Sequence, residues 1–281
     1  MLPLSNDTDA PPIDAVRAFS AQASHFDSDD ESSTILQWMR AQVYRHEEEF
    51  LAPGDSILEL NSGTGIDAVR FARMGCTVLA TDAAEGMIER LREKIRRLKF
   101  EERISALRCG FTELAELPDR KFDHVFSNFG GLNCIPDLRR VTKDLPRLLK
   151  PGATVTFVFM PPVCPWEIVQ VLRGKFGFAF RRFSKHGTEA QVDGVRFRAY
   201  YFSPRKAVHS FDGRFIPVRL RGLASVTPPP GSRNFPDRHP RLYRMLTRLE
   251  ERCAGMYPFN RYADHIILTM KYLPERVSEE R

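Results

Sequence analysis

Ser56-Ile57-Leu58-Glu59-Leu60-Asn61-Ser62-Gly63-Thr64-Gly65 is the stretch that decides the fold. An apolar run typical of a buried strand ends in an acidic residue and a glycine-rich turn. A helical pattern follows from Ile66, and a second apolar strand, residues 77–81, ends at Asp82. The order of strand, glycine loop, helix, strand and acid is typical of the first half of a nucleotide-type crevice in a doubly wound sheet.

The residue types of this unit indicate how a ligand would be held. Gly63 and Gly65 let the backbone approach a ligand where a Cβ atom would collide. The helix that begins near Ile66 directs free N–H groups and its positive dipole end at the same place. Asp82 follows the glycines by about twenty residues, which suits one β-α-β step, and its carboxylate can accept both hydroxyls of a ribose.

Glu59 bears on which ligand the loop takes. Residues 63–68 also fit the G-x-G-x-x-A pattern of dinucleotide-binding proteins, although such short patterns occur by chance. Glu59 lies just before the loop, where a buried carboxylate repels a pyrophosphate and attracts an ammonium or sulfonium cation. An NAD(P)-dependent oxidoreductase is the alternative. It predicts a second mononucleotide half and a Tyr-x-x-x-Lys set, and the sequence shows neither.

Four motifs in order carry a resemblance to the class I S-adenosylmethionine (SAM)-dependent methyltransferases, of the small-molecule type. They are residues 59–65 (motif I, E/D-x-G-x-G-x-G), Thr81-Asp82 (ribose motif), residues 122–128 (fourth strand) and residues 148–152 (turn before the fifth strand). The resemblance covers roughly residues 55–160. Asn61 departs from it, because the family usually has glycine there, but asparagine tolerates positive φ better than most residues.

This resemblance implies an α/β fold with a doubly wound, seven-stranded, mostly parallel sheet, and SAM as the cofactor. It implies that the glycine loop lies along the methionine part of SAM, that Asp82 holds the ribose, and that the adenine is bordered after the third strand, where an aromatic ring would stack. The expected cofactor-binding residues are Glu59, Asn61, Gly63, Gly65, Asp82, Ala83, Met87, Gly110, Phe111, Asn128 and Phe129.

The segments around the motifs predict the domain organisation. Residues 1–12 are polar and predict a disordered tail, and residues 13–281 predict one methyltransferase domain. Within it, helical patterns over 13–23 and 33–50 predict an N-terminal cover over the cofactor. Residues 161–202 predict an α+β lid inserted after the fifth strand, with a helix over 165–180 and a hairpin turn at Asp193-Gly194. Its aromatic residues would line the acceptor pocket or pack the small core of the insertion itself: Trp166, Phe176, Phe178, Phe180, Tyr200 and Tyr201.

Composition narrows the functional class. With 281 residues, 42% of them hydrophobic, the chain can bury one sizeable core. No apolar run reaches the roughly 20 residues of a membrane helix, and the N-terminus lacks the pattern of a secretory signal. The five cysteines are odd in number and scattered, which favours reduced thiols in a cytoplasmic protein. No metal site and no obligate protein partner are expected.

Charge is unevenly distributed. The net charge is +6, yet residues 173–248 hold 17 Lys and Arg against 4 Asp and Glu. This segment could meet an acidic small molecule, an anionic membrane surface or nucleic acid. It could equally be a solvated face whose arginine stems cover apolar surface.

The predicted reaction is methyl transfer from SAM to a small-molecule or lipid-like acceptor. A general base is needed only if the acceptor loses a proton, and the catalytic residue is not identified. The candidates are His25, Tyr200, His209 and His265. The other hypotheses are the oxidoreductase, a nucleic-acid methyltransferase or binding protein that uses residues 173–248, and a non-catalytic SAM-binding regulator. Residues 128–133 do not match the N/D-P-P-Y/F signature of amino-group methylation on adenine or glutamine, and nucleic acid is not the expected partner.

Overall fold

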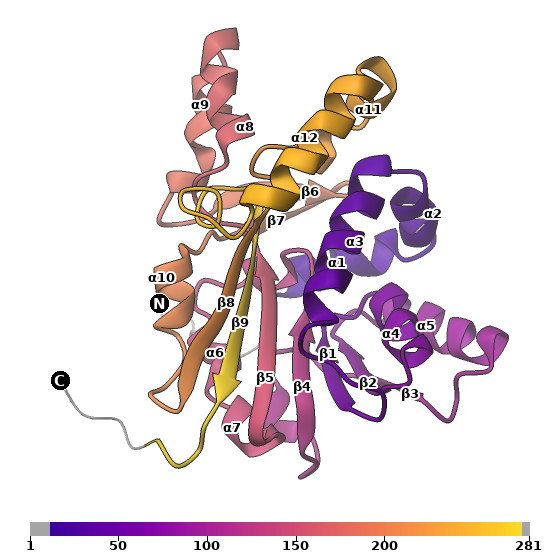
Figure 1. The fold of residues 1–281 in the computed structure, drawn as a ribbon. Coiled ribbons are helices and arrows are strands. Elements are labelled where there is room, and N and C mark those ends of the chain that lie inside the picture. Colours follow the sequence, from indigo (N-terminus) through magenta and orange to yellow (C-terminus); the bar gives the residue numbers. More distant parts are fainter. Residues whose placement is uncertain (1–11, 277–281) are drawn as a thin grey trace, which may run out of the picture.

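The computed structural model describes residues 12–276, which form a central sheet with helices on both faces (Figure 1). The predicted disordered tail therefore lies outside the described residues, except for Pro12. The sheet has seven strands in the order β3-β2-β1-β4-β5-β9-β8. The strands are β1 (Ser56–Leu60), β2 (Thr77–Asp82), β3 (Ile104–Arg108), β4 (Phe122–Ser127), β5 (Leu149–Phe159), β8 (Phe215–Leu223) and β9 (His265–Tyr272), and a separate hairpin holds β6 (Thr188–Val192) and β7 (Val195–Ala199).

The strand directions confirm the predicted doubly wound, mostly parallel sheet. β1 pairs in parallel with β2 on one side and with β4 on the other, and β4 pairs in parallel with β5. β9 runs antiparallel to both of its neighbours, β5 and β8. Strand order reverses between β1 and β4, and in open α/β sheets ligands bind at such a switch point, beyond the carboxyl ends of the strands.

Both faces of the sheet are buried, as the continuous apolar runs of its central strands predict. Successive side chains of a strand point to opposite faces, so Ile57 and Leu58 of β1 belong to different core clusters. On the face shared with Ile57, the rings of Phe71 and Phe126 meet edge to face, with centroids 5.0 Å apart. The two cores fix β1, β2 and β4 and so hold the loops at their carboxyl ends.

Most of the helices agree with the sequence patterns, although two short helices were not predicted and one predicted helix is interrupted. The helices of the described residues are α1 (Ile13–Gln22), α2 (Phe26–Glu31), α3 (Thr34–Glu47), α4 (Ile66–Arg73), α5 (Glu85–Leu98), α6 (Arg139–Thr142), α7 (Leu145–Leu148), α8 (Pro165–Ile168), α9 (Phe176–Phe180), α10 (Pro204–Val208), α11 (Phe235–Arg238) and α12 (Pro240–Cys253). The sequence analysis missed α2, whose FDSDDE sequence has no apolar period. The single helix predicted over 165–180 is wrong, because Gly174 takes a left-handed φ of 71° and separates a 3-10 turn from α9. The segment 136–149 is two short helices, with Pro146 in the second.

The hairpin of the insertion packs on the N-terminal helices. Asp193 and Gly194 both have positive φ, 46° and 79°, as the turn of a two-residue hairpin requires. The ring of Phe197 on β7 lies against Phe19 on α1, with centroids 5.6 Å apart. Within residues 12–276, every helix is too short or too polar to cross a lipid bilayer.

Candidate cofactor site

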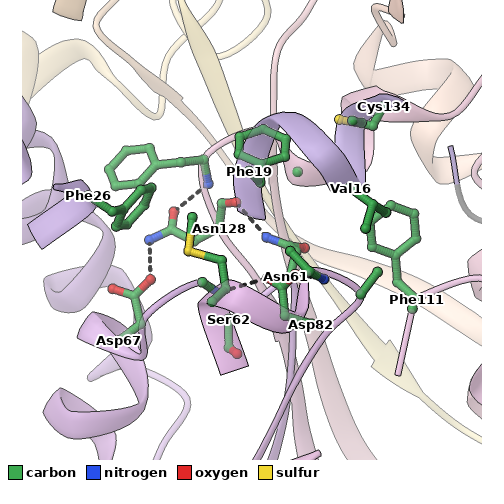
Figure 2. A pocket seen from close by; sticks show the side chains of 18 of the residues that line it. Val16, Phe19, Phe26, Asn61, Ser62, Asp67, Asp82, Phe111, Asn128 and Cys134 are labelled. Atoms are coloured by element: carbon green, nitrogen blue, oxygen red, sulfur yellow. Dashed lines mark hydrogen bonds between the residues drawn. The ribbon is translucent and has the colours of Figure 1, made fainter. Parts of the chain in front are cut away.

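A cavity lies at the carboxyl ends of β1, β2, β3 and β4 (Figure 2). The loops after the four strands form its floor, and α1, α2 and α3 contribute Val16, Phe19, Phe26 and Arg40 to its walls. The N-terminal segment is thus a wall of the cavity, while no residue of 161–202 lines it.

Asp82 joins the end of β2 to the glycine loop. One carboxylate oxygen accepts the Gly63 N–H at 2.9 Å, and the other accepts the Ala84 N–H at 2.8 Å. Burial raises the pKa of this carboxyl, although the backbone hydrogen bonds oppose the shift. Each oxygen has a further lone pair, so a carboxylate held in this way can still accept hydroxyl protons from a ligand in the cavity.

The glycine loop leaves no room for a side chain at Gly65, whereas Gly63 has space for a Cβ atom but a positive φ of 55°. Gly65 has a φ of 79°, and a Cβ atom there would overlap the side chain of Leu91 on α5. A Cβ atom at Gly63 would lie 3.7 Å from the ring of Phe26 and 4.0 Å from the sulfur of Met87. Both positions take positive φ angles, so the backbone conformation of the loop favours glycine at each of them.

Asn61 compensates for the glycine that the resemblance leads us to expect. Its φ is 45°, and its amide donates to the Asn128 carbonyl at 3.0 Å and accepts from the Ser127 hydroxyl at 2.6 Å. These bonds tie the loop after β1 to the end of β4. A Cβ atom at Gly131 would lie 2.5 Å from the Asn61 amide, so the asparagine also requires a glycine at that position.

A buried charged network closes one end of the cavity. The Arg40 guanidinium, 5% exposed, donates to Asp67 at 2.6 Å and to Asp30 at 2.8 Å. Tyr44 donates to the same Asp67 oxygen at 2.6 Å, and the Asn128 amide donates to the other oxygen at 3.0 Å. Burial, followed by the charge of Asp67, raises the pKa of Tyr44, so its hydroxyl keeps its proton. Figure 2 shows Asp67 and Asn128 on the opposite side of the cavity from Phe111 and Val16.

The sequence analysis missed this network. Arg40 lies on the helix that was predicted over 33–50, but an arginine between apolar positions was not read as buried. Its spacing of four residues from Tyr44 places both side chains on one face of α3, and the guanidinium stacks on the Phe129 ring at 4.7 Å. That helical spacing is the one signal that could have indicated the site.

Glu59 lies behind the cavity wall and does not line it. The residue is 1% exposed, and one of its carboxyl oxygens has no hydrogen-bond partner. Burial raises the pKa of Glu59 well above its usual range; the charge of Asp67 adds to the shift, while Arg40 and Lys94 oppose it. Glu59 is therefore not placed to contact a ligand in the cavity, and the raised pKa favours its neutral form, which would not attract a cation.

Asp27 fastens the cover to the glycine loop. The Thr64 hydroxyl donates to one of its oxygens at 2.5 Å, and Lys94 on α5 lies 2.7 Å from the other. Lys94 is almost fully buried, and it donates to the Thr64 hydroxyl as well, at 3.4 Å. Because Asp27 is the second residue of α2, these bonds hold Phe26 over Gly63.

The candidate bases all lie off the cavity wall. His25 lies between Asp29 and Asp193, with each ring nitrogen 2.7 Å from a carboxylate. His209 is exposed, and the Tyr200 backbone is bonded to Asn133. His265 is 7% exposed, and its Nδ1 lies 2.9 Å from the Asp264 carboxylate. Its ring packs edge to face on Phe129, which lines the cavity and separates His265 from it.

The insertion contains one buried charged group of its own. Cys164, Glu167 and Asp264 lie close enough together to share a cation. The guanidinium of Arg182 lies 2.7 Å from Glu167 and 2.6 Å from Asp264 and supplies that positive charge. This group fixes the start of the insertion to the start of β9.

The structure brings together nine of the eleven residues predicted to bind the cofactor, because nine line the cavity and only Glu59 and Gly65 do not. The predicted aromatic wall is not formed: Trp166 packs on Phe235, and Phe176, Phe178 and Phe180 are exposed.

Comparison with known proteins shows that the first strands of the sheet and the loops between them are similar to methyltransferases. The family profile described as "Methyltransferase domain" matches residues 57–152. The demethylmenaquinone methyltransferase of Corynebacterium glutamicum (strain R) is 28% identical over 163 residues, which are 57% of this chain and 65% of that protein. The enzyme of the same name from Clavibacter sepedonicus is 34% identical over 48% of this chain and 55% of its own length. The matched region thus spans less than two thirds of these relatives.

Solved structures agree at the level of the fold. A putative SAM-dependent methyltransferase from Listeria monocytogenes has a TM-score of 0.58 at 15% identity, over 82% of this chain and 96% of its own. Geranyl diphosphate methyltransferase in complex with SAM has a TM-score of 0.56 at 15% identity, over 85% of this chain and 86% of its own. These matches show that residues 57–152 resemble a methyltransferase domain and that the described chain shares the fold of these solved structures.

Proposed function

We propose that the chain binds SAM in the cavity and transfers its methyl group to a small, apolar or lipid-like acceptor. The observation that carries the proposal is the placement of Asp82. Its carboxylate accepts hydrogen bonds from Gly63 and Ala84, and both Asp82 and Gly63 line the cavity. A carboxylate at this place suits the two hydroxyls of a ribose.

The two ends of the cavity suit the two ends of SAM. Val16 and Phe111 offer apolar surface for the adenine, and the Phe111 ring can stack on it. At the other end, Arg40 is the cation that lines the cavity, and it is placed to receive the carboxylate of the amino-acid part. The Asp67 carboxylate holds that guanidinium in position.

The chain's own contribution to the reaction is orientation and the exclusion of water. Bound SAM would supply an electrophilic methyl carbon on a sulfonium. Phe19 and Phe26 cover the cavity, and Asp27 fastens their segment to the glycine loop. A covered, apolar site raises the rate by holding the acceptor atom in line and by removing competing water.

The cavity wall favours an acceptor that needs little help with its proton. Among the described residues, no histidine lines the cavity. Burial raises the pKa of the lining thiol of Cys134 to about 12, so it is a poor base at neutral pH. An acceptor that ionises readily or loses no proton meets this condition. The relatives named demethylmenaquinone methyltransferase support an apolar acceptor of this kind.

Titration calorimetry with SAM, S-adenosylhomocysteine and NADH tests the proposal. We expect both SAM compounds to bind and NADH not to bind. Asp82→Ala should weaken SAM binding by about tenfold to a hundredfold, which corresponds to the loss of charged hydrogen bonds. Asp123→Ala is the matched control, because the Asp123 carboxylate accepts the Ser56 N–H at the amino ends of β1 and β4, away from the cavity.

Binding of NADH in place of SAM would establish the oxidoreductase alternative. Equal SAM affinity of the two variants would reject the assignment of Asp82. Binding of SAM without methyl transfer to any phenolic, quinol or prenyl acceptor would favour the SAM-binding regulator.

A further inference from the structure

The insertion exposes large apolar side chains that nothing in the described chain covers. We call residues 169–185 the insertion tip. Leu172 is 86% exposed, Phe176 59% and Phe183 51%. Val169, Phe178 and Phe180 are exposed as well. Monomeric soluble proteins rarely gather so many large apolar groups on one exposed segment unless the segment meets a partner.

The tip is also basic. Between Val169 and Lys185 the sequence contains no Asp or Glu. Arg173, Lys175 and Lys185 are exposed, and the structure of residues 12–276 gives them no ion pair. Cations interleaved with phenylalanines are typical of segments that lie at an anionic lipid surface, where the rings enter the acyl boundary and the charges meet headgroups.

The base of the tip is rigid although its surface is exposed. Glu167 is 5% exposed and Arg182 is 4% exposed. Arg181 and Arg182 both donate to Glu167, at 2.6 and 2.7 Å, and Arg182 continues to Asp264 at the start of β9. The phenylalanines are therefore presented from a fixed stem and are not the unpacked side of a loose loop.

A second surface of the same kind stands beside the tip. α12 exposes Leu242, Met245 and Leu249, which are three and seven residues apart along one side of the helix. Exposed arginines accompany them at positions 241, 244 and 248. Figure 1 shows α8, α9 and α12 extending past the sheet at the same end. The Trp166 ring on α8 contacts the Phe235 ring on α11, the short helix before α12, with centroids 5.8 Å apart.

The tip and α12 project from the end of the sheet that carries the cavity, where the parallel strands have their carboxyl ends. β5 ends at Phe159 and leads into the insertion. The antiparallel β9 begins at His265, at the same end of the sheet. The cavity lies at the carboxyl ends of the neighbouring parallel strands. A partner surface in contact with the insertion tip and α12 would therefore lie at the same end of the sheet as the cavity.

We propose that the insertion tip and the exposed face of α12 dock the protein on an anionic lipid membrane. The proposal deepens the proposed function, because a lipid-like acceptor would then be met at the surface in which it resides, but docking itself does not require methyl transfer. A second copy is disfavoured because two tips facing one another would bring like charges together. The aliphatic Val169 and Leu172 suit acyl chains better than stacked bases, which need aromatic platforms.

Vesicle co-sedimentation of the full chain tests the proposal. We expect the protein to sediment with vesicles of phosphatidylcholine and phosphatidylglycerol, to bind vesicles of phosphatidylcholine alone at least about tenfold more weakly, and to lose binding as salt rises. Leu172→Ser with Phe176→Ser should weaken binding by about tenfold or more, because two apolar anchors are removed. Arg173→Gln with Lys175→Gln should do the same on anionic vesicles only.

Matched controls are available on the far edge of the sheet. Leu107→Ser changes an exposed leucine on β3, and Arg96→Gln with Arg97→Gln removes two exposed cations on α5. Both controls should sediment as the parent protein does, and every variant should keep its melting temperature. SAM calorimetry on the tip variants should give unchanged affinity, so failure of docking and failure of SAM binding are separate results.

Three results would overturn the proposal. The first is equal sedimentation of the tip and control variants, and the second is no binding to anionic vesicles at all. The third is a tip-dependent dimer in sedimentation velocity, or tip-dependent binding of RNA or DNA, without vesicle binding.

Discussion

The glycine-loop region and the insertion differ in how far apart in sequence their contacts lie. In residues 55–160, the bond that defines the site joins Gly63 to Asp82, 19 residues later. The contact of the insertion with the cover joins His25 to Asp193, 168 residues later. Short-range geometry follows from the chain's own strand-loop-helix pattern, whereas the second kind of contact requires the complete fold. The difference explains why sequence motifs predicted the geometry of the first region and not the contacts of the second.

The largest expected effect is on the buried pair that links the cover to the loop region. Arg40→Met should lower the free energy of unfolding by about 3–5 kcal/mol, because Asp67 and Asp30 would remain buried with their charges uncompensated. SAM affinity should fall as well. Urea denaturation and calorimetry measure the two effects.

Arg45→Met on the same helix is the matched control. Its partner Glu251 is half-exposed, and the change should cost less than about 1 kcal/mol. Equal losses from the two variants would show that Arg40 does not hold the cover to the glycine loop.

The next effect concerns the backbone of the glycine loop. Gly65→Ala should destabilise the protein by about 2–4 kcal/mol, because the left-handed φ of 79° penalises a side chain and the new methyl group would meet Leu91. Gly152→Ala has a similar φ of 83° in open space and should cost only about 1–2 kcal/mol. Thermal melts compare the two, and a larger loss from Gly152→Ala would contradict the packing described here.

A smaller effect separates side-chain bonding from backbone strain. Asn61→Gly should destabilise the protein by about 1 kcal/mol, because two hydrogen bonds to β4 are lost while strain is relieved. Lys99→Gly also relieves a positive φ, 58°, at the end of α5, and should stabilise by up to about 1 kcal/mol. Opposite signs in urea denaturation are the expected result, and a gain in both variants would mean that Asn61 is merely strained.

The smallest effect is the pH dependence of the contact between cover and insertion. The Asp29 and Asp193 carboxylates accept hydrogen bonds from the His25 ring and so raise the pKa of His25. The stability that this histidine contributes is therefore fully present below its unfolded pKa of about 6.5 and disappears as the pH rises through the higher folded value. Asp193→Asn should lower the folded pKa in an NMR titration, and its stability deficit should shrink at alkaline pH. A deficit that grows with pH would refute this assignment.

The sequence predicted the region in which the residues of the candidate site lie close together along the chain. The strand ending at Glu59, the glycine loop and Asp82 predicted the parallel sheet, and most of the residues named around them line the cavity. It failed where the apolar period is absent or interrupted. α2 is polar and was missed, Arg40 was left out of the buried face of α3, and Gly174 breaks a helix that composition favoured.

By itself, the sequence determined the class of fold and the place of the ligand crevice, because glycine, strand and acid positions act through neighbouring backbone. Only the tertiary structure decided which residues close the crevice and which side chains the insertion exposes. Arg40 becomes a cavity residue because Asp67 compensates its charge in the interior. The insertion's phenylalanines, which suggested a pocket wall, face outward because Glu167 and Arg182 fix the stem that carries them.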